Sequence, residues 1–176
     1  GLHGLVNCIG SLLLKPAHAT TDEEFRRVVE TNLFTAFATV RAGARALRER
    51  GGSIILFDSA AAEIGIANHE AIAAAKAGVI QMSKVMAIQH AADHIRVNTV
   101  VPGQLHTPMV ESRLAGQRAG GDVQALLNQR LARIPLGFMG DGRDSASAAL
   151  FLAPEDARFI TGTEIVVDGG MTVRCG

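Results

Sequence analysis

Residues 51–59 read Gly-Gly-Ser-Ile-Ile-Leu-Phe-Asp-Ser, and this stretch decides the fold class. Its central run, Ser53–Phe57, is almost continuously apolar and follows a glycine, which is typical of a strand buried on both faces of a sheet. Strands of this kind occur in parallel sheets that carry helices on both sides. The run stops at Asp58 and Ser59, so two polar side chains stand at the carboxyl end of the expected strand.

A long helix is expected on each side of this strand. Before it, Thr21–Glu24 forms a capping box with acidic residues in the first turn. Apolar residues then recur at helical spacing until two glycines end the pattern, which predicts a helix over about 21–50. The apolar positions are Phe25, Val28, Val29, Leu33, Phe37 and Val40. After the strand, an alanine-rich segment begins a second helix, expected over about 69–92.

Three more short apolar runs predict strands at Leu5-Val6, Ile95–Val101 and Ile165–Val167. Because strands and helices alternate, we expect an α/β fold with one Rossmann-like, doubly wound parallel sheet, and a single domain over residues 1–176. Such sheets bind ligands at the carboxyl ends of their strands. A polar segment over 107–136 is expected to cover that edge as a flap, and a short helix is expected over 144–152. The first strand is expected to be an exposed sheet edge.

The composition excludes several functions. The 176 residues include 17 basic and 17 acidic side chains, so the chain lacks the positive charge that nucleic-acid or anionic-membrane partners require. No apolar run reaches the roughly 18 residues of a membrane span, and the two cysteines predict no disulfide framework, so we expect a cytoplasmic location. No residue spacing predicts a metal site. The chain contains neither tyrosine nor tryptophan, so no phenol can act in its chemistry.

Taken in order, these features resemble the short-chain dehydrogenase/reductase family over essentially the whole chain. Asn32 falls where the family keeps a structural and proton-relay asparagine, Ser59 where it has its catalytic serine, and Lys76 at the lysine of its Tyr-x-x-x-Lys motif. The resemblance implies a small carbonyl or hydroxyl substrate, with NAD or NADP as the cofactor. In this family the serine hydrogen-bonds the substrate oxygen, and the lysine lowers the phenol pKa and holds the nicotinamide ribose.

The same resemblance implies a set of cofactor-binding residues. The strand end at 7–10, Asn-Cys-Ile-Gly, is similar to the family's Asn-Asn-Ala-Gly, and the segment 102–107 is similar to its Pro-Gly loop against nicotinamide. The segment 160–170 is similar to its closing signature. The residues implied to contact the cofactor are Asn7, Gly10, Lys76, Pro102, Gly103 and Thr107.

Two departures from the family pattern bear on function. Ile72 occupies the tyrosine position four residues before Lys76, so a general acid worth about 10²–10⁴ in rate is absent there. The glycine-rich phosphate-binding turn, which in the family precedes all the segments above, is not in the sequence. We therefore expect residues 1–176 alone to bind a dinucleotide poorly. Since the first residue is Gly1, we expect the C-terminal part of a longer or processed chain.

The site residues also have structural interpretations. Ser59 can simply be a turn residue after a strand. Lys76 can be a charged side chain that extends along the apolar surface to reach solvent. Asn32 can be a buried amide that hydrogen-bonds backbone groups. His69 shares a helix face with position 72, so it can replace the missing acid or simply stand in the first helical turn. His106, just past the Pro-Gly loop, is a weaker candidate for the same role.

Two functions remain open at this point. The first is an NAD(P)-dependent oxidoreductase with a degenerate active site, and the second is a catalytically silent subunit or scaffold paired with an active homologue. The resemblance also implies a homo- or hetero-oligomer joined through the helices at 21–50 and 69–92, although burial against the sheet explains part of the same apolar stripe. The apolar residues that fit this interface are Val79, Met82, Val85 and Met86.

Overall fold

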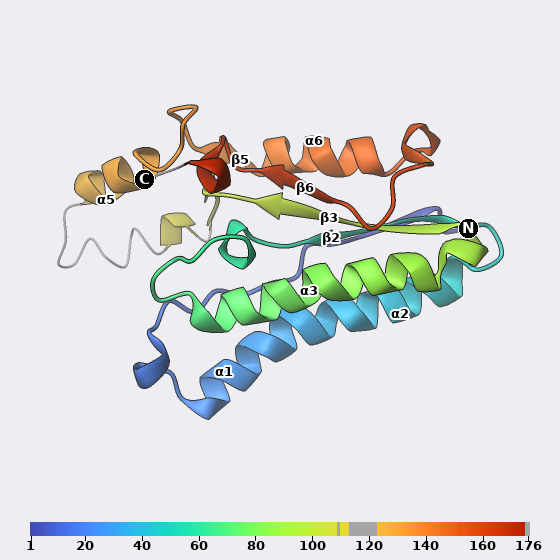
Figure 1. Cartoon of the computed structure of the whole chain (residues 1–176), viewed down its shortest axis with the longest axis horizontal. Coiled ribbons are helices and arrows are strands. Elements are labelled where there is room, and N and C mark those ends of the chain that lie inside the picture. Colours follow the sequence, from blue (N-terminus) through green and yellow to red (C-terminus); the bar gives the residue numbers. More distant parts are fainter. Residues whose placement is uncertain (109, 113–122, 175–176) are drawn as a thin grey trace.

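The centre of the structure is a parallel sheet with α1, α2 and α3 on one face and α6 on the other (Figure 1). The computed structural model describes residues 1–108, 110–112 and 123–174. The strands pair in the order β1-β2-β3-β6, all parallel. Their bounds are β1 (Gly4–Asn7), β2 (Gly52–Phe57), β3 (Ile95–Pro102) and β6 (Glu164–Val167). The α/β fold and its four expected strands are therefore confirmed, with β1 at one edge.

The first long helix is continuous but changes its winding in the middle. It consists of α1 (Asp22–Val29), a π-helical turn η2 (Glu30–Phe34) and α2 (Thr35–Leu47). The backbone stays right-handed helical at both junctions. The prediction over 21–50 is confirmed, whereas the apolar spacing gave no sign of the π-helical turn.

The second long helix, α3 (Glu70–Gln89), is three residues shorter at its C-terminus than expected. A short 3₁₀ turn, η4 (Ala91–Asp93), follows it, and His94 then adopts the left-handed conformation that turns the chain into β3. Gly51 lies against this turn, with φ of 73° and an imaginary Cβ only 2.6 Å from the His94 carbonyl oxygen. Only glycine fits there, which explains why the glycine pair joins α2 to β2.

The remaining elements are short, apart from α6. They are η1 (Ala17–Ala19), η3 (Ala60–Ala62), β4 (Leu105–His106), α5 (Val123–Leu131), β5 (Gly140–Asp141), α6 (Gly142–Leu152), η5 (Glu155–Ala157) and η6 (Met171–Val173). The strands β4 and β5 pair in a second, two-stranded parallel sheet that we did not expect. Within the expected flap over 107–136, residues 109 and 113–122 lie outside the described part of the chain.

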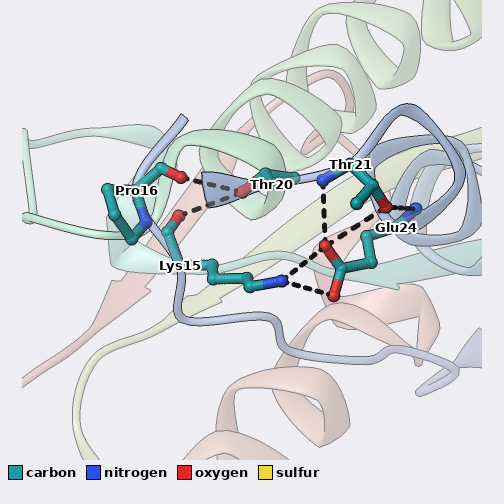
Figure 2. Close-up of polar contacts among 5 residues, drawn as sticks. All are labelled: Lys15, Pro16, Thr20, Thr21 and Glu24. Carbon is teal, nitrogen blue, oxygen red and sulfur yellow. Dashed lines mark hydrogen bonds and ion pairs between the residues drawn. The ribbon is translucent and has the colours of Figure 1, made fainter. Parts of the chain in front are cut away.

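The capping box predicted at the start of α1 is present and is tied to the preceding loop (Figure 2). The Thr21 hydroxyl accepts a hydrogen bond from the Glu24 backbone N–H at 3.2 Å, and the Glu24 carboxylate accepts one from the Thr21 N–H at 2.9 Å. The Lys15 ammonium group donates to both Glu24 oxygens at 2.8 Å. The hydrogen bonds from Lys15 and then from Thr21 hold the pKa of Glu24 below its usual range. The loop between β1 and α1 is thereby anchored to the helix.

Three apolar clusters make up the core, and two of them cover the faces of the sheet. The largest joins α2 and α3 to β2 and β3, with Val40, Ile54, Val79 and Val97 fully buried. A second cluster joins α1 to the beginning of α3 and contains Ile72. The third lies under α6 on the opposite face. The sheet is therefore covered on both sides, as the apolar run at 53–57 predicts.

Among the described residues, α3 is the one helix long and apolar enough to cross a membrane, with a mean hydropathy of 1.3. The apolar composition of α3 follows from its packing, because one face of the helix contacts the sheet and α1. The helix also carries Lys76 and Lys84. It serves here as a core helix, and its hydropathy follows from that role.

Candidate active site

A cavity of about 510 Å³ lies at the carboxyl end of the sheet. Its walls come from the loop after β1, the end of β2, the first turns of α3, the loop after β3, and one face of α5. This is the edge at which parallel α/β sheets bind ligands. The site residues from the sequence that line it are Gly10, Asn32, Ser59, His69, Ile72, Lys76, Pro102, Gly103 and Thr107.

Two of the sequence candidates lie elsewhere. The Asn7 side chain donates to the Thr39 hydroxyl at 2.9 Å and accepts from the Ile9 N–H at 2.8 Å, so it fastens the end of β1 to α2. His106 is exposed, and its ring lies 3.5 Å from the Glu111 carboxylate. Neither residue is part of the cavity wall.

Lys76 is buried and points into the cavity wall rather than toward solvent. Only 6% of the residue is exposed, and its ammonium group donates to the Phe57 carbonyl at 2.6 Å. Burial lowers the pKa of Lys76, and the nearby Asp58 carboxylate opposes that shift. The interpretation of Lys76 as a charge that snorkels to solvent is therefore wrong.

Asn32 lies in the π-helical turn and is almost completely buried, with 1% exposed. Its amide group donates to the Ser11 hydroxyl at 3.0 Å and to the Val28 carbonyl at 2.9 Å, and its oxygen accepts from the Ser11 N–H at 3.1 Å. These bonds fix the loop after β1 against the helix. π-Helical turns are frequent at functional sites, and this one places Asn32 beside Gly10.

The end of β2 presents Ser59 to the cavity. Its hydroxyl oxygen accepts a hydrogen bond from the Ala61 N–H at 3.2 Å, which caps η3. The hydroxyl hydrogen is left to donate to another oxygen. Ser59 is therefore both a turn residue and a hydrogen-bond donor available at the cavity wall.

Position 72 offers no proton donor. Ile72 is 3% exposed and packs with Val28, Ala71 and Ala75 between α1 and α3. One turn away, the His69 ring nitrogen Nδ1 lies 2.8 Å from the Ala67 carbonyl oxygen. Because a carbonyl only accepts, Nδ1 carries the hydrogen, and Nε2 can donate only when the ring is charged.

The Pro102-Gly103 loop is held close to the end of β6. An imaginary Cβ on Gly103 would lie 2.5 Å from the Asp168 Cβ, so a larger residue would force the two strand ends apart. The Asp168 carboxylate accepts from the Gly170 N–H at 2.8 Å and the Thr172 N–H at 2.6 Å. Although burial opposes it, this bonding keeps the pKa of Asp168 below its usual range. Asp168 therefore stabilises the turn that follows β6.

Sequence reasoning placed the segment 107–136 over this edge of the sheet, but it did not identify Asp58 or the individual side chains of α5 in the cavity wall. Asp58 was noted only as the end of a strand, yet it lines the cavity beside Ser59. On α5, one helix face contributes Leu126, Gln129 and Arg130, and Arg133 follows in the turn after the helix. The spacing of three and four residues from Leu126 was a signal that could have identified this face. Among the described residues, no group of three His, Cys, Asp or Glu side chains is arranged to hold a metal ion.

A parallel α/β sheet with a serine, a lysine and an asparagine around one cavity at its carboxyl edge defines a dehydrogenase-type nucleotide-binding fold. The family model described as "Enoyl-(Acyl carrier protein) reductase" matches residues 1–172. The chain belongs to the short-chain dehydrogenase/reductase family.

Several known proteins are similar to this chain. It is 37% identical over 97% of its length to "Inactive 2-(S)-hydroxypropyl-CoM dehydrogenase 2" of Xanthobacter autotrophicus, and covers 74% of that protein. It is 39% identical over 85% of its length to a 3-oxoacyl-[acyl-carrier-protein] reductase of Salmonella typhimurium, and covers 58% of it. The chain therefore spans between about half and three quarters of these relatives.

Solved structures agree with this assignment. A short-chain dehydrogenase/reductase from Burkholderia xenovorans is 48% identical and superposes with a TM-score of 0.94, over 99% of this chain and 66% of that protein. Aldohexose dehydrogenase from Thermoplasma acidophilum, 29% identical, superposes with a TM-score of 0.91 over 99% of this chain and 69% of that protein. The predicted family and Rossmann-like fold are confirmed.

Proposed function

We propose that this protein is an NAD- or NADP-dependent oxidoreductase that interconverts a carbonyl and a hydroxyl group, with an active site that lacks the family's phenol. The observation that carries the proposal is the shared cavity of Ser59, Lys76 and Asn32, with Ile72 at the position of the acid. The substrate is a small molecule, and a cytoplasmic location is part of the same proposal.

The residues around the cavity fit a nicotinamide cofactor. Gly10 leaves bare backbone toward the cavity, since a Cβ there would come within 3.1 Å of the Asn32 oxygen and 3.8 Å of the Lys76 nitrogen. Lys76 and Gly10 would hold the ribose side, and the loop from Pro102 to Thr107 would lie against the ring. When bound, the cofactor supplies or accepts a hydride.

The chain's own residues would then act on the substrate oxygen. The Ser59 hydroxyl donates a hydrogen bond to that oxygen, and the Lys76 ammonium group stabilises the negative charge that develops on it. Because both groups stand at a partly water-excluded wall, their effect is larger than it would be in bulk water. Ile72 contributes only apolar surface, so proton transfer is the step this site performs poorly.

The alternative function is a catalytically silent subunit that acts beside an active homologue. Two observations favour it: Ile72 is packed into an apolar cluster, and a relative that is 37% identical carries "inactive" in its name. Under this alternative, the protein binds the cofactor without turnover alone, and turnover returns when a copurifying homologue is added.

Cofactor binding separates these functions from a purely structural role. Because residues 1–176 alone are expected to bind a dinucleotide poorly, the test uses the full-length protein, in which we expect NADH or NADPH to bind and to gain fluorescence. We expect Lys76→Met to weaken this binding about 10- to 100-fold, because a charge-assisted hydrogen bond contributes roughly 1.5–3 kcal/mol. Lys84→Met is the matched control, since Lys84 lies on the same helix but pairs with Glu164 outside the cavity. Turnover is then followed on a panel of alcohols and ketones. Equal affinities of the wild type and Lys76→Met would contradict the proposal.

We also propose that the protein forms an oligomer through α1–α2 and α3. Of the four residues assigned to this interface, Val79 is fully buried in the core and Met82 and Met86 pack against it, which corrects the prediction for those three. Val85 is exposed. The apolar side chains left exposed on these helices are Phe25, Phe34, Phe37, Val85 and Ile88.

Ile88 gives the sharpest test of this interface, because 80% of it is exposed. We expect Ile88→Glu to lower the mass measured by sedimentation equilibrium, since a buried charge opposes association. Leu150→Glu is the control, because Leu150 is 73% exposed on α6, on the other face of the sheet. Dissociation by Leu150→Glu with no effect of Ile88→Glu would assign the interface to α6 instead.

A further inference from the structure

Asp58 lines the same cavity as Ser59 and Lys76, and among the described residues only one of its carboxylate oxygens has a hydrogen-bond partner. Oδ1 accepts from the Ser59 backbone N–H at 2.7 Å. Oδ2 is buried and has no partner within the described part of the chain. The Lys76 ammonium group is held nearby, because it donates to the carbonyl of Phe57, whose peptide bond leads directly into Asp58.

Three charged groups from different elements act on this carboxyl group. Burial raises the pKa of Asp58 to about 7, and the Lys76 ammonium group on α3 opposes the rise. Glu164 on β6 and Glu63, just after η3, add to it. Glu164 is paired in turn with Lys84 on α3 at 2.6 Å. Asp58 therefore has one cationic neighbour that favours its ionised form and two acidic neighbours that disfavour it.

We propose that Asp58 is a positioning residue that controls the charge of Lys76, so that the two side chains form an electrostatically coupled pair in the wall of the cavity. When Asp58 is ionised, its negative charge favours the charged form of Lys76 through space. When Asp58 is protonated, that effect is lost, while the Phe57 carbonyl remains the acceptor of the Lys76 ammonium group. This inference goes beyond the proposed function, since it holds whether or not the site turns over a substrate.

The pair has a consequence for the whole site. Because two interacting groups titrate as a unit, removing either one must shift the proton affinity of the other. The cavity gains one unit of negative charge as Asp58 ionises near neutral pH. The family's phenol is absent from this cavity, and Asp58 with Lys76 provides a place where a proton can be held instead.

Nuclear magnetic resonance of the ¹³C-labelled carboxyl groups tests this directly in the intact protein. We expect the Asp58 carboxyl to titrate with a midpoint near pH 7 and Lys76→Met to raise that midpoint by about one pH unit or more. Asp58→Asn is expected to lower the titration midpoint of the Lys76 ammonium group. Asp168 is the internal control, because its carboxylate is held by the backbone of its own turn and should titrate in the acidic range in every variant.

A midpoint for Asp58 below pH 5, or one that Lys76→Met leaves unchanged, would overturn the proposal. If Lys76→Met does not fold, the titration midpoint of the Lys76 ammonium group in Asp58→Asn tests the coupling, and stability measurements on Asp58→Asn and Asp58→Ser test the raised pKa of Asp58. Since the folded-state pKa of about 7 exceeds the ordinary 3.8, the stability that Asp58 contributes is full below about pH 4 and is lost as the pH rises to 7. The stability of each variant relative to the wild type should therefore increase between pH 4 and 7 and then level off. A difference that does not change with pH would contradict the pair.

Discussion

Replacing Ile72 by tyrosine is expected to raise the rate of carbonyl reduction by about 10²–10⁴-fold, because this range is the usual contribution of a positioned general acid. Position 72 lines the cavity, one helical turn before Lys76, with Ser59 on the same cavity wall. A phenol introduced there would stand near a buried cation, which lowers its pKa and prepares it to give up its proton. The measurement is the oxidation of NADPH or NADH with saturating ketone, compared between the wild type and Ile72→Tyr.

Ile72→Phe is the matched control for this gain. It adds an aromatic ring without the hydroxyl group, so it reports how much stability the protein loses when a ring is placed beside Val28, Ala71 and Ala75. Thermal unfolding of both variants measures this loss of stability separately from activity. If Ile72→Tyr folds, binds the cofactor and is no faster than Ile72→Phe, the cavity is not a degenerate form of the family's active site, and the silent-subunit function is favoured.

His69 can be assessed in the same series. If His69 supplies the proton in the wild type, His69→Gln lowers wild-type turnover and alters its pH profile, but leaves Ile72→Tyr largely unaffected, because the phenol has taken over that step. Because Nδ1 donates its hydrogen to the Ala67 carbonyl, the other ring nitrogen, Nε2, can donate a proton to the substrate only when the His69 ring is charged. Unchanged turnover and an unchanged pH profile in His69→Gln would leave His69 as a residue of the first helical turn.

The sheet and its helices were predictable because their signals are local. A continuous apolar run such as 53–57 can only be buried on both faces, and Thr21 with Glu24 forms the same capping box that the sequence predicts. Asn32, Ser59 and Lys76 were predictable through a family pattern of residue types in fixed order. The strand order then brings them to one cavity.

The features that escaped prediction depend on contacts between distant segments. The π-helical turn at Asn32 is stabilised by bonds to Ser11, 21 residues away, which apolar periodicity does not record. The charge balance of Asp58 is set by Lys76, Glu63 and Glu164, which only the folded chain brings together. The sequence left open whether Lys76 is a site residue or a charge that reaches solvent, and the Phe57 carbonyl gives it a partner inside the protein. Residue type alone contains no information about such partners.

Asn32→Ala is expected to destabilise the protein by roughly 1–3 kcal/mol, because truncation removes three hydrogen bonds of a buried side chain to half-buried Ser11 and to the Val28 carbonyl. The affected groups are the N–H and hydroxyl of Ser11, which Asn32 now holds, while the Val28 carbonyl loses its extra donor. Denaturant unfolding measures the loss. Asn128→Ala on α5 is the control, since that amide is exposed and an exposed substitution usually changes stability by less than about 0.5 kcal/mol.

The same substitution separates the structural from the catalytic interpretation of this asparagine. If Asn32 acts only by anchoring the loop after β1, Asn32→Ala should weaken NADH binding, because Gly10 lies in that loop, and adding osmolyte that restores folding should restore binding as well. If Asn32 also takes part in proton transfer, turnover in the Ile72→Tyr background should stay low even where binding is restored. A variant that is as stable as the wild type would contradict the anchoring role that both interpretations include, since it would show that the three hydrogen bonds of this buried side chain contribute nothing to the fold.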